Sequence, residues 1–193
     1  MNLKENIMKK VKNIRILALS GSLRKKSYNT ALINAVAQLA PAEIEVVVFD
    51  EMELLPLFNP DREDEDIRAI IKLQEELNKS DGLIISSPEY AHGISGVLKN
   101  ALDWLVSGED FPYIPVALYN TSPRATHAQA ALREVITTMS ANIIESACVS
   151  VPLLGTNLDA AGIVKNEEIS QLMLGKINLF GDEILKCSSK NKV

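Results

Sequence analysis

Short apolar segments alternate with amphipathic segments along this 193-residue chain, and this alternation constrains the fold more tightly than any other feature of the sequence. The apolar segments have the length and the flanking turn residues of buried strands, and they cover residues 14–19, 44–49, 82–86, 114–120 and 143–151. Each is followed by apolar residues at helical spacing, within residues 32–39, 67–77, 97–105, 132–139 and 166–184. Strands that are apolar throughout and separated by helices predict a parallel sheet with helices on both faces.

The number of strand–helix units narrows the topology. Crossover connections between parallel strands are right-handed, so few arrangements are open. Five units suit the strand order 2-1-3-4-5 better than a six-stranded nucleotide-binding fold. We therefore expect an α/β three-layer sandwich with a five-stranded parallel sheet, formed as one domain over residues 1–193. Residues 1–13 carry four lysines and are expected to be a basic N-terminal extension.

Composition excludes several classes of protein. Apolar residues make up 47% of the chain and charged residues 23%, which fits a globular protein and argues against disorder. No apolar run reaches the roughly 18 residues that a membrane span needs, and the N-terminal segment lacks the apolar core of a signal peptide. Cys148, Cys187, His92 and His127 lack the spacing of metal ligands. We expect a cytoplasmic protein without a metal site and without membrane contact.

The charge is unevenly distributed. The first 26 residues carry eight Lys and Arg against one Glu, whereas the whole chain has a net charge of −5. A basic segment is compatible with nucleic-acid binding, but the acidic whole and an aromatic content of 5% argue against it. A small anionic ligand near the basic segment explains the distribution better.

The first predicted strand runs directly into a polar segment, residues 20–29, which reads Ser-Gly-Ser-Leu-Arg-Lys-Lys-Ser-Tyr-Asn and precedes a helix. In a doubly wound sheet, the free N–H groups and partial positive charge of this helix N-terminus favour a phosphate. Arg24 can bind a phosphate through two parallel hydrogen bonds, and Lys25 or Lys26 would offset its second charge. The segment lacks the Gly-Lys-Ser/Thr of a P-loop and the Gly-x-Gly-x-x-Gly of a dinucleotide site. The alternative is a polar capping loop with Ser27 or Asn29 at the helix N-cap and solvated lysines.

A second segment, residues 87–104, follows the third predicted strand and should face the first segment across the sheet edge. Residues 88–90 are Pro-Glu-Tyr, and residues 96–104 are Gly-Val-Leu-Lys-Asn-Ala-Leu-Asp-Trp. Together with residues 21–29, which match Gly-Ser-Leu-Arg-x-x-Ser-x-Asn at every position, these segments resemble the NAD(P)H-dependent FMN reductase family. This is a flavodoxin-like group that includes quinone, azo-dye and chromate reductases. The resemblance extends from about residue 14 to the last predicted helix and implies a flavodoxin-like fold.

By this resemblance, the first segment holds the phosphate of FMN, and the second segment with the loop after the fourth strand lines the isoalloxazine ring. The residues implied at the cofactor are Ser20, Ser22, Arg24, Ser27, Tyr28, Asn29, Pro88, Glu89, Tyr90, Ala91, His92, Gly93, Ser122 and Pro123. No side chain is expected to act as the catalyst, because the flavin itself carries the hydride chemistry. Arg124 is expected either to bind a phosphate of the pyridine nucleotide or to be an ordinary surface arginine.

Three positions depart from the family pattern. The Asn that follows the Tyr is Ala91 here, the Pro that precedes the Gly is Ser95, and the glycine turn after the fourth strand is replaced by residues 121–127 without glycine. These changes bear on flavin affinity, redox potential and choice of substrate more than on the fold.

The resemblance implies an enzyme that passes hydride from NADPH or NADH through bound FMN to a small acceptor, which can be a quinone, a flavin, an azo compound or a metal oxyanion. It also implies a homodimer or homotetramer. Two alternatives stay open. One is a non-enzymatic electron carrier like flavodoxin, which would stabilise a flavin radical. The other is an FMN-binding regulator that has lost turnover through the change at Ala91 and the altered third loop.

Overall fold

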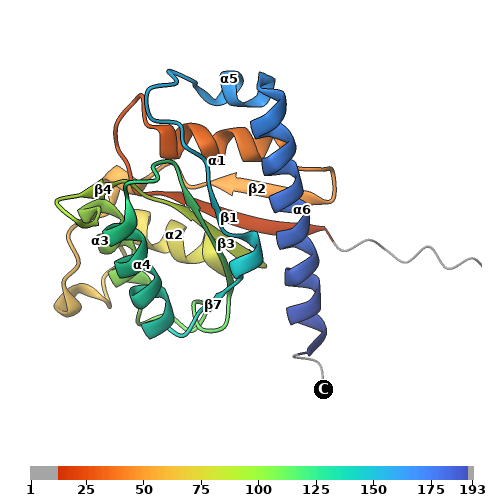
Figure 1. Ribbon diagram of the computed structural model, residues 1–193. Coiled ribbons are helices and arrows are strands. Elements are labelled where there is room, and N and C mark those ends of the chain that lie inside the picture. The colour runs from red at the N-terminus through yellow and green to blue at the C-terminus, as the bar shows by residue number, and fades with distance from the viewer. Residues whose placement is uncertain (1–12, 191–193) are drawn as a thin grey trace, which may run out of the picture.

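A parallel sheet lies between two layers of helices in the computed structural model, which describes residues 13–190 (Figure 1). The strand order is β2-β1-β3-β6-β7, with β8 also paired to β6, and every pairing in this sheet is parallel. The strands are β1 (Ile14–Ser20), β2 (Ile44–Val48), β3 (Gly82–Ser86), β6 (Pro115–Asn120), β7 (Asn142–Ile143) and β8 (Val149–Ser150). The predicted α/β fold and strand order are confirmed, and the predicted basic extension lies almost wholly outside the described residues.

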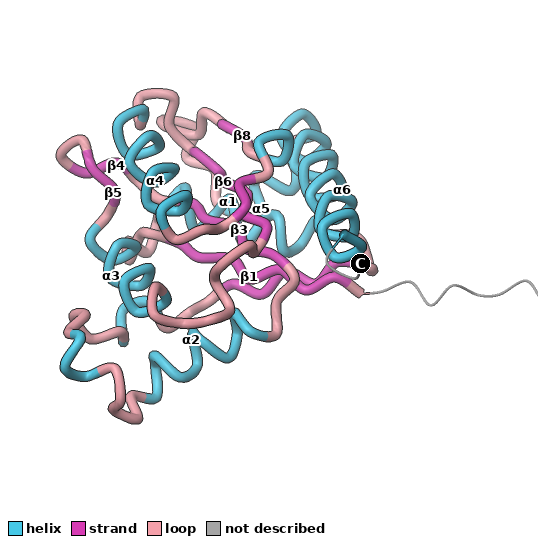
Figure 2. The backbone as a smooth tube through the Cα atoms, turned by 90° about the horizontal axis from the view of Figure 1, so that it is seen from below, coloured by secondary structure: helices cyan, strands magenta, loops and turns pink. Residues whose placement is uncertain are grey.

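The helices form two distinct layers, as Figures 1 and 2 show from perpendicular directions. One face of the sheet is covered by α2 (Arg68–Asn78), α3 (Gly96–Leu105) and α4 (Thr126–Thr138). The other is covered by α1 (Tyr28–Leu39), α5 (Ala160–Lys165) and α6 (Glu167–Lys190). Along β1, Leu17 and Leu19 join the first core, whereas Ile16 and Ala18 join the second. This alternation explains why the strand is apolar at every position.

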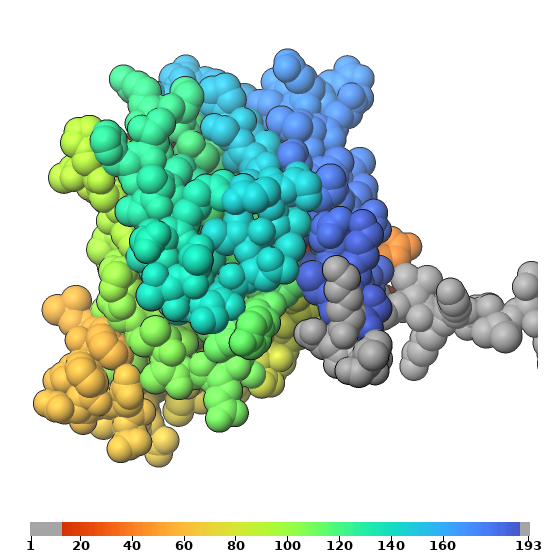
Figure 3. All heavy atoms as spheres, turned by 60° about the horizontal axis from the view of Figure 1, so that its bottom comes forward, coloured from red at the N-terminus to blue at the C-terminus, as the bar shows by residue number. Residues whose placement is uncertain are grey.

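The predicted fifth strand is interrupted, so the prediction of a continuous strand over residues 143–151 was wrong. β7 pairs with the start of β6 and β8 with its end, and the 3₁₀ turn η3 (Glu145–Ala147) separates them. Across the gap, the Leu118 backbone nitrogen donates to Cys148 Sγ at 3.3 Å instead of to a strand carbonyl. Lys176 of α6 donates to the Ser146 carbonyl at 2.7 Å, and Figure 3 shows this segment beside α6.

Side-chain caps fix where the helices begin. Ser27 accepts a hydrogen bond from Thr30 N at the start of α1, so Ser27 rather than Asn29 is the N-cap. Ser95 accepts one from Leu98 N at the start of α3. Ser95, which replaces the family proline, therefore has a capping role here. Helix α5 was not predicted, because six residues are too few to display a helical period.

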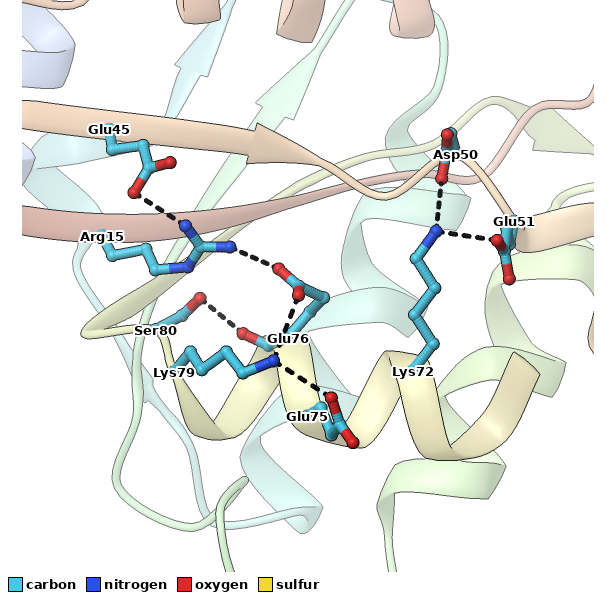
Figure 4. Close-up of polar contacts among 9 residues, drawn as sticks. All are labelled: Arg15, Glu45, Asp50, Glu51, Lys72, Glu75, Glu76, Lys79 and Ser80. Carbon is cyan, nitrogen blue, oxygen red and sulfur yellow. Dashed lines mark hydrogen bonds and ion pairs between the residues drawn. The ribbon is translucent and has the colours of Figure 1, made fainter. Parts of the chain in front are cut away.

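Ion pairs hold α2 against the edge of the sheet away from α4 (Figure 4). Arg15 of β1 donates to Glu45 of β2 at 2.7 Å and to Glu76 of α2 at 2.5 Å. The hydrogen bond that Arg15 donates to Glu45 is the largest influence that raises the pKa of Arg15. Lys72 of α2 binds Asp50 and Glu51, which follow β2. Contacts at both ends of β2 thus fix the position of this helix.

None of the helices within residues 13–190 combines the length and the apolar character that a bilayer span requires.

Candidate functional site

A cavity of about 320 Å³ opens at the carboxyl ends of β1, β3 and β6. Parallel α/β sheets bind ligands at this edge, where the strand order reverses beside β1. Three loops that are distant in sequence form its walls, and a fourth segment contributes one residue. The lining residues are Ser22, Arg24, Lys26, Ser27, Tyr28, Asn29, Ser87, Pro88, Glu89, Tyr90, Asn120, Thr121, Ser122, Arg124, Ala125 and Leu154.

The loop after β1 is held in a fixed shape by its own serines. Ser20 Oγ accepts a hydrogen bond from Ser22 N at 3.3 Å, and Ser22 Oγ accepts one from Arg24 N at 3.4 Å. Gly21 lies so close to the next loop that an added Cβ would be 2.3 Å from Ser87 Oγ. Glycine therefore allows this loop to approach the segment after β3, and Gly21 N donates to the Ser86 carbonyl at 2.8 Å.

Cationic and hydroxyl donors collect where this loop enters α1. Ser22 and Ser27 are buried, and Arg24 and Lys26 are exposed at the rim of the same cavity. The first turn of a helix leaves backbone N–H groups without helical partners, and its end carries a partial positive charge. Two cations, two hydroxyls and free N–H groups make this end of the cavity suited to a dianionic phosphate.

Asn29 of α1 links the ends of two strands beside the cavity. Its side chain is buried, and Oδ1 accepts from Ser86 Oγ at 2.9 Å and from Thr121 Oγ1 at 3.1 Å. Ser86 ends β3, and Thr121 directly follows β6. The amide oxygen is committed to these hydroxyls, so Nδ2 is the part of the side chain with donors to offer a ligand. Asn29 thus joins a structural role to its predicted binding role.

The predicted turn-rich loop after β3 is a short hairpin, formed by β4 (Glu89–Tyr90) and β5 (Gly93–Ile94). Its two turn residues, Ala91 and His92, have φ values of 47° and 60°. Two central residues with positive φ are what a type I′ hairpin turn requires, and Asn or Gly usually occupies these positions. Both side chains are exposed at the tip, and neither lines the cavity.

Glu89 connects this hairpin to α4, and Figure 2 shows the hairpin beside this helix. Glu89 Oε2 accepts a hydrogen bond from Ala128 N at 2.8 Å, and Oε1 lies 3.2 Å from His92 Nδ1. The bond from Ala128, assisted by the nearby histidines, lowers the pKa of Glu89 below its ordinary value. The rings of His92 and His127 meet edge to face, with centroids 4.5 Å apart. The carboxylate therefore stays ionised at neutral pH and fixes one wall of the cavity.

The cavity brings together most of the predicted cofactor residues. Nine of them line it: Ser22, Arg24, Ser27, Tyr28, Asn29, Pro88, Glu89, Tyr90 and Ser122. Ser20 lies beneath, where its hydroxyl is 2.7 Å from that of Thr30. The remaining predicted residues are absent from the lining, and they are Ala91, His92, Gly93 and Pro123. The first three are carried to the hairpin tip, and Pro123 is exposed on the loop after β6.

Sequence reasoning missed five lining residues: Ser87, Asn120, Thr121, Ala125 and Leu154. Most of them follow β3 or β6 at the carboxyl edge of the sheet. The rule that ligands bind beyond the carboxyl ends of strands could have identified Ser87, Asn120 and Thr121. Leu154 comes from the segment after β8, and its approach depends on tertiary packing that no local pattern reveals.

The donor set of the cavity fits FMN. The hydroxyls of Ser22 and Ser27 and the cations of Arg24 and Lys26 at the α1 end suit its phosphate. The other end is bounded by Pro88, Tyr90 and Leu154, whose apolar surfaces suit a planar aromatic ring. The arrangement therefore offers one polar end and one apolar end, as a flavin mononucleotide has.

Comparisons with known proteins agree with this geometry. A family model described as NADPH-dependent FMN reductase matches residues 14–154. A quinone reductase of Escherichia coli K12 is 28% identical over 179 residues, which are 89% of this chain and 95% of that protein. An NAD(P)H-dependent FMN reductase of Pseudomonas aeruginosa is 28% identical over 172 residues, which are 83% of this chain and 90% of that protein.

The fold is similar to that of FerB, a flavoenzyme NAD(P)H:(acceptor) oxidoreductase from Paracoccus denitrificans. The TM-score is 0.74 at 26% identity, and the match covers 90% of this chain and 98% of that one. The family model covers well over half of the chain, including all three loops that form the cavity. The chain therefore belongs to the NADPH-dependent FMN reductase family, and it is an NAD(P)H-dependent oxidoreductase with FMN as its cofactor.

Proposed function

We propose that this protein oxidises NAD(P)H and reduces a small quinone, with FMN held in the cavity at the carboxyl edge of the sheet. One observation carries the proposal: the cavity has a cationic, hydroxyl-rich end at α1 and an apolar end at the β4–β5 hairpin. When bound, FMN supplies the hydride-accepting and hydride-donating chemistry. The chain supplies binding, orientation and charge.

The α1 end would hold the phosphate. Arg24 and Lys26 would offset its two negative charges, and the Ser22 and Ser27 hydroxyls with Asn29 Nδ2 would donate hydrogen bonds. The hydrogen bonds that Ser20 Oγ and Ser22 Oγ accept within the loop after β1 preorganise these donors, so little conformational freedom is lost on binding.

The hairpin end would take the flavin ring and, beside it, the acceptor. Tyr90 and Leu154 are about half exposed at 50% and 55%, and both border the cavity. Exposed apolar surface beside a cofactor site favours a flat organic acceptor over a small hydrated oxyanion. The similarity to the quinone reductase of Escherichia coli supports the same class.

A spectrum and a rate test the proposal. The protein as purified, or after addition of FMN, should show the visible absorbance of bound flavin and should consume NAD(P)H when benzoquinone is present. With FMN kept at saturation, Tyr90→Ala should raise KM for benzoquinone and leave KM for ferricyanide unchanged, because that anion needs no apolar surface. Absence of both flavin binding and NAD(P)H consumption would remove the proposal.

The same preparation separates the reductase from its alternatives. A flavodoxin-like carrier would accumulate the flavin radical during dithionite titration and would react slowly with NAD(P)H. A regulator would bind FMN but would show no steady-state rate with any acceptor. The reductase should show rapid turnover with a quinone and little radical.

A further inference from the structure

Three of the residues that the structure describes in the cavity wall are cations, and two of them are assigned to the phosphate. Arg24 and Lys26 lie on the loop after β1, whereas Arg124 lies on the loop after β6. Among the described residues, Arg124 forms no ion pair with a carboxylate. Glu89 in the same lining accepts from Ala128 N, so the positive end of α4 offsets its charge. Arg124 is therefore a positive charge left over once the flavin phosphate and Glu89 are matched.

The loop that carries Arg124 crosses from the phosphate end of the cavity to the hairpin. At its start, Thr121 Oγ1 donates to Asn29 Oδ1 of α1 at 3.1 Å. Beyond it, Ala128 N donates to Glu89 Oε2 at 2.8 Å, and Figure 2 shows α4 beside the hairpin. Because Arg124 lies between these two contacts in the chain and lines the cavity, it is available to a ligand that lies against the hairpin.

Hydrogen bonds hold this loop in a fixed turn. Asn120 Nδ2 donates to the Ser122 carbonyl at 2.8 Å, and Asn120 Oδ1 accepts from Ser122 N at 3.0 Å. Ser122 Oγ accepts from Arg124 N at 3.4 Å, and the Ser122 carbonyl also accepts from Ala125 N at 3.1 Å. The backbone of Arg124 is therefore fixed while its side chain is exposed, so a ligand at the guanidinium would cost little backbone freedom.

The surfaces around this arginine suit a ligand with a flat ring and one negative charge. Tyr90 and Leu154 are about half exposed and border the same cavity. A guanidinium is planar and weakly hydrated, and it binds two anionic oxygens through parallel hydrogen bonds. A quinone with a hydroxyl group on its ring matches both surfaces, because loss of the hydroxyl proton spreads the negative charge over two oxygens of the conjugated ring.

We infer that Arg124 selects quinones that carry an ionised oxygen group, either a carboxylate or a hydroxyl that has lost its proton. Arg124 would bind the anionic oxygen, and Tyr90 and Leu154 would contact the ring. The inference rests on the proposed function, because it takes the flavin phosphate to lie at the α1 end and the quinone at the hairpin end. It adds the charge of the substrate, which apolar surface alone does not determine.

Two naphthoquinones of nearly equal size test the inference: 2-hydroxy-1,4-naphthoquinone is an anion at pH 7, and 2-methyl-1,4-naphthoquinone is neutral. With FMN and NADPH at saturation, Arg124→Gln should raise KM for the hydroxy compound about tenfold or more, the scale of one charge-assisted hydrogen bond. KM for the methyl compound should be unchanged. Arg124→Lys keeps the charge without the planar fork and should restore part of the loss. Arg133→Gln is the matched control, because Arg133 is an exposed arginine of α4 that pairs with Glu145 and does not line the cavity.

Calorimetric titration of the hydroxy compound into the protein, with FMN added and NADPH omitted, measures the same contact without turnover. Its Kd should rise by the same factor in Arg124→Gln. An unchanged Kd and KM for the hydroxy compound, or an equal rise in KM for both quinones, would overturn the inference. A rise in Kd for FMN or in KM for NADPH instead would assign Arg124 to a phosphate and would also overturn it. Reduction of the methyl compound by the wild type is measured separately, so a failure of the proposed function is distinguished from a failure of this inference.

Discussion

Glu89 and Ala128 are 39 positions apart in sequence, yet Glu89 Oε2 accepts a hydrogen bond from the Ala128 backbone nitrogen at 2.8 Å. Ala128 lies in the first turn of α4, whose own N-cap residue, Ala125, offers no side-chain hydrogen bond. Glu89 therefore supplies the missing cap from the hairpin, with a negative charge at the positive end of the helix. Glu89, which was expected to line the cofactor ring, therefore also fixes the hairpin and the start of α4 relative to each other.

Two replacements of Glu89 should destabilise the protein to different extents. Glu89→Gln keeps an acceptor for Ala128 N but removes the charge, whereas Glu89→Ala removes both. We expect Glu89→Ala to lower Tm by about 2–4 °C, the scale of a lost helix cap in a chain of this size, and Glu89→Gln to lower it less. Thermal unfolding followed by circular dichroism at pH 7 measures both. Equal Tm values for the wild type and Glu89→Ala would show that the bond contributes nothing.

The same carboxylate predicts a pH dependence. The pKa of Glu89 is lower in the folded protein than its ordinary value of 4.5, chiefly because Ala128 N donates to the ionised form. Folding therefore favours the charged form, so the stabilisation is fully present above the unfolded-state pKa and is lost as the pH falls through the folded-state pKa. The stability difference between wild type and Glu89→Gln should be constant above about pH 5.5 and should shrink below about pH 4.5. A difference that grows on acidification would contradict this assignment.

The phosphate end of the site could be predicted from sequence because local chemistry specifies it. A strand, a serine-rich turn and a helix start are consecutive in residues 14–30, and three of the hydrogen bonds that shape the loop span only two or three positions. The bond from Glu89 to Ala128 could not be predicted in this way, because it joins separate units that only the tertiary fold brings together.

The fifth strand shows a different limit. Residues 143–151 are mostly apolar, so their pattern is that of a buried strand. The break at η3 arises because the chain leaves the ladder of β6 and returns, with the Cys148 thiol accepting from Leu118 N in the gap. A free cysteine usually behaves as a small apolar residue, so the role of Cys148 as an acceptor has no signal in the sequence.

Arg24 is predicted to provide most of the charge-assisted binding to the FMN phosphate. Arg24→Ala should weaken FMN binding by about 1.5–3 kcal/mol, the scale of a hydrogen bond to a charged group, which is roughly ten- to 150-fold in Kd. Flavin fluorescence quenching measures Kd. Lys25→Ala is the matched control, because Lys25 is a neighbouring cation that does not line the cavity. An unchanged Kd for Arg24→Ala would place the phosphate elsewhere.

Substitutions at the hairpin tip should increase the stability of the folded protein. Ala91 has φ of 47°, a conformation that costs an L-residue with Cβ roughly 1–2 kcal/mol. Ala91→Gly and Ala91→Asn should each stabilise the protein by about 0.5–1 kcal/mol in urea unfolding, since Gly and Asn accept positive φ. Ala91→Val should destabilise it, because a β-branched residue is poorly tolerated there. FMN affinity should be similar in all three variants, because residue 91 is absent from the cavity lining. Loss of stability in Ala91→Gly would mean that the turn has another conformation.

Gly21 lies at the contact between the loop after β1 and the segment after β3, two of the three loops that form the cavity. In Gly21→Ala, the new Cβ would lie 2.3 Å from Ser87 Oγ and 2.7 Å from Ser87 Cβ, so one loop must move. We expect a loss of about 1–3 kcal/mol in stability, the usual scale of overpacking, together with weaker FMN binding because the serine-fixed loop is displaced. Ser87→Gly removes both clashing atoms, so the double variant Gly21→Ala/Ser87→Gly should recover part of the stability and part of the affinity. Ser95 Oγ, at 2.8 Å from the same Cβ, limits that recovery because it must keep its cap on α3. A double variant no better than Gly21→Ala would show that the glycine is needed for some reason other than the approach of these two loops.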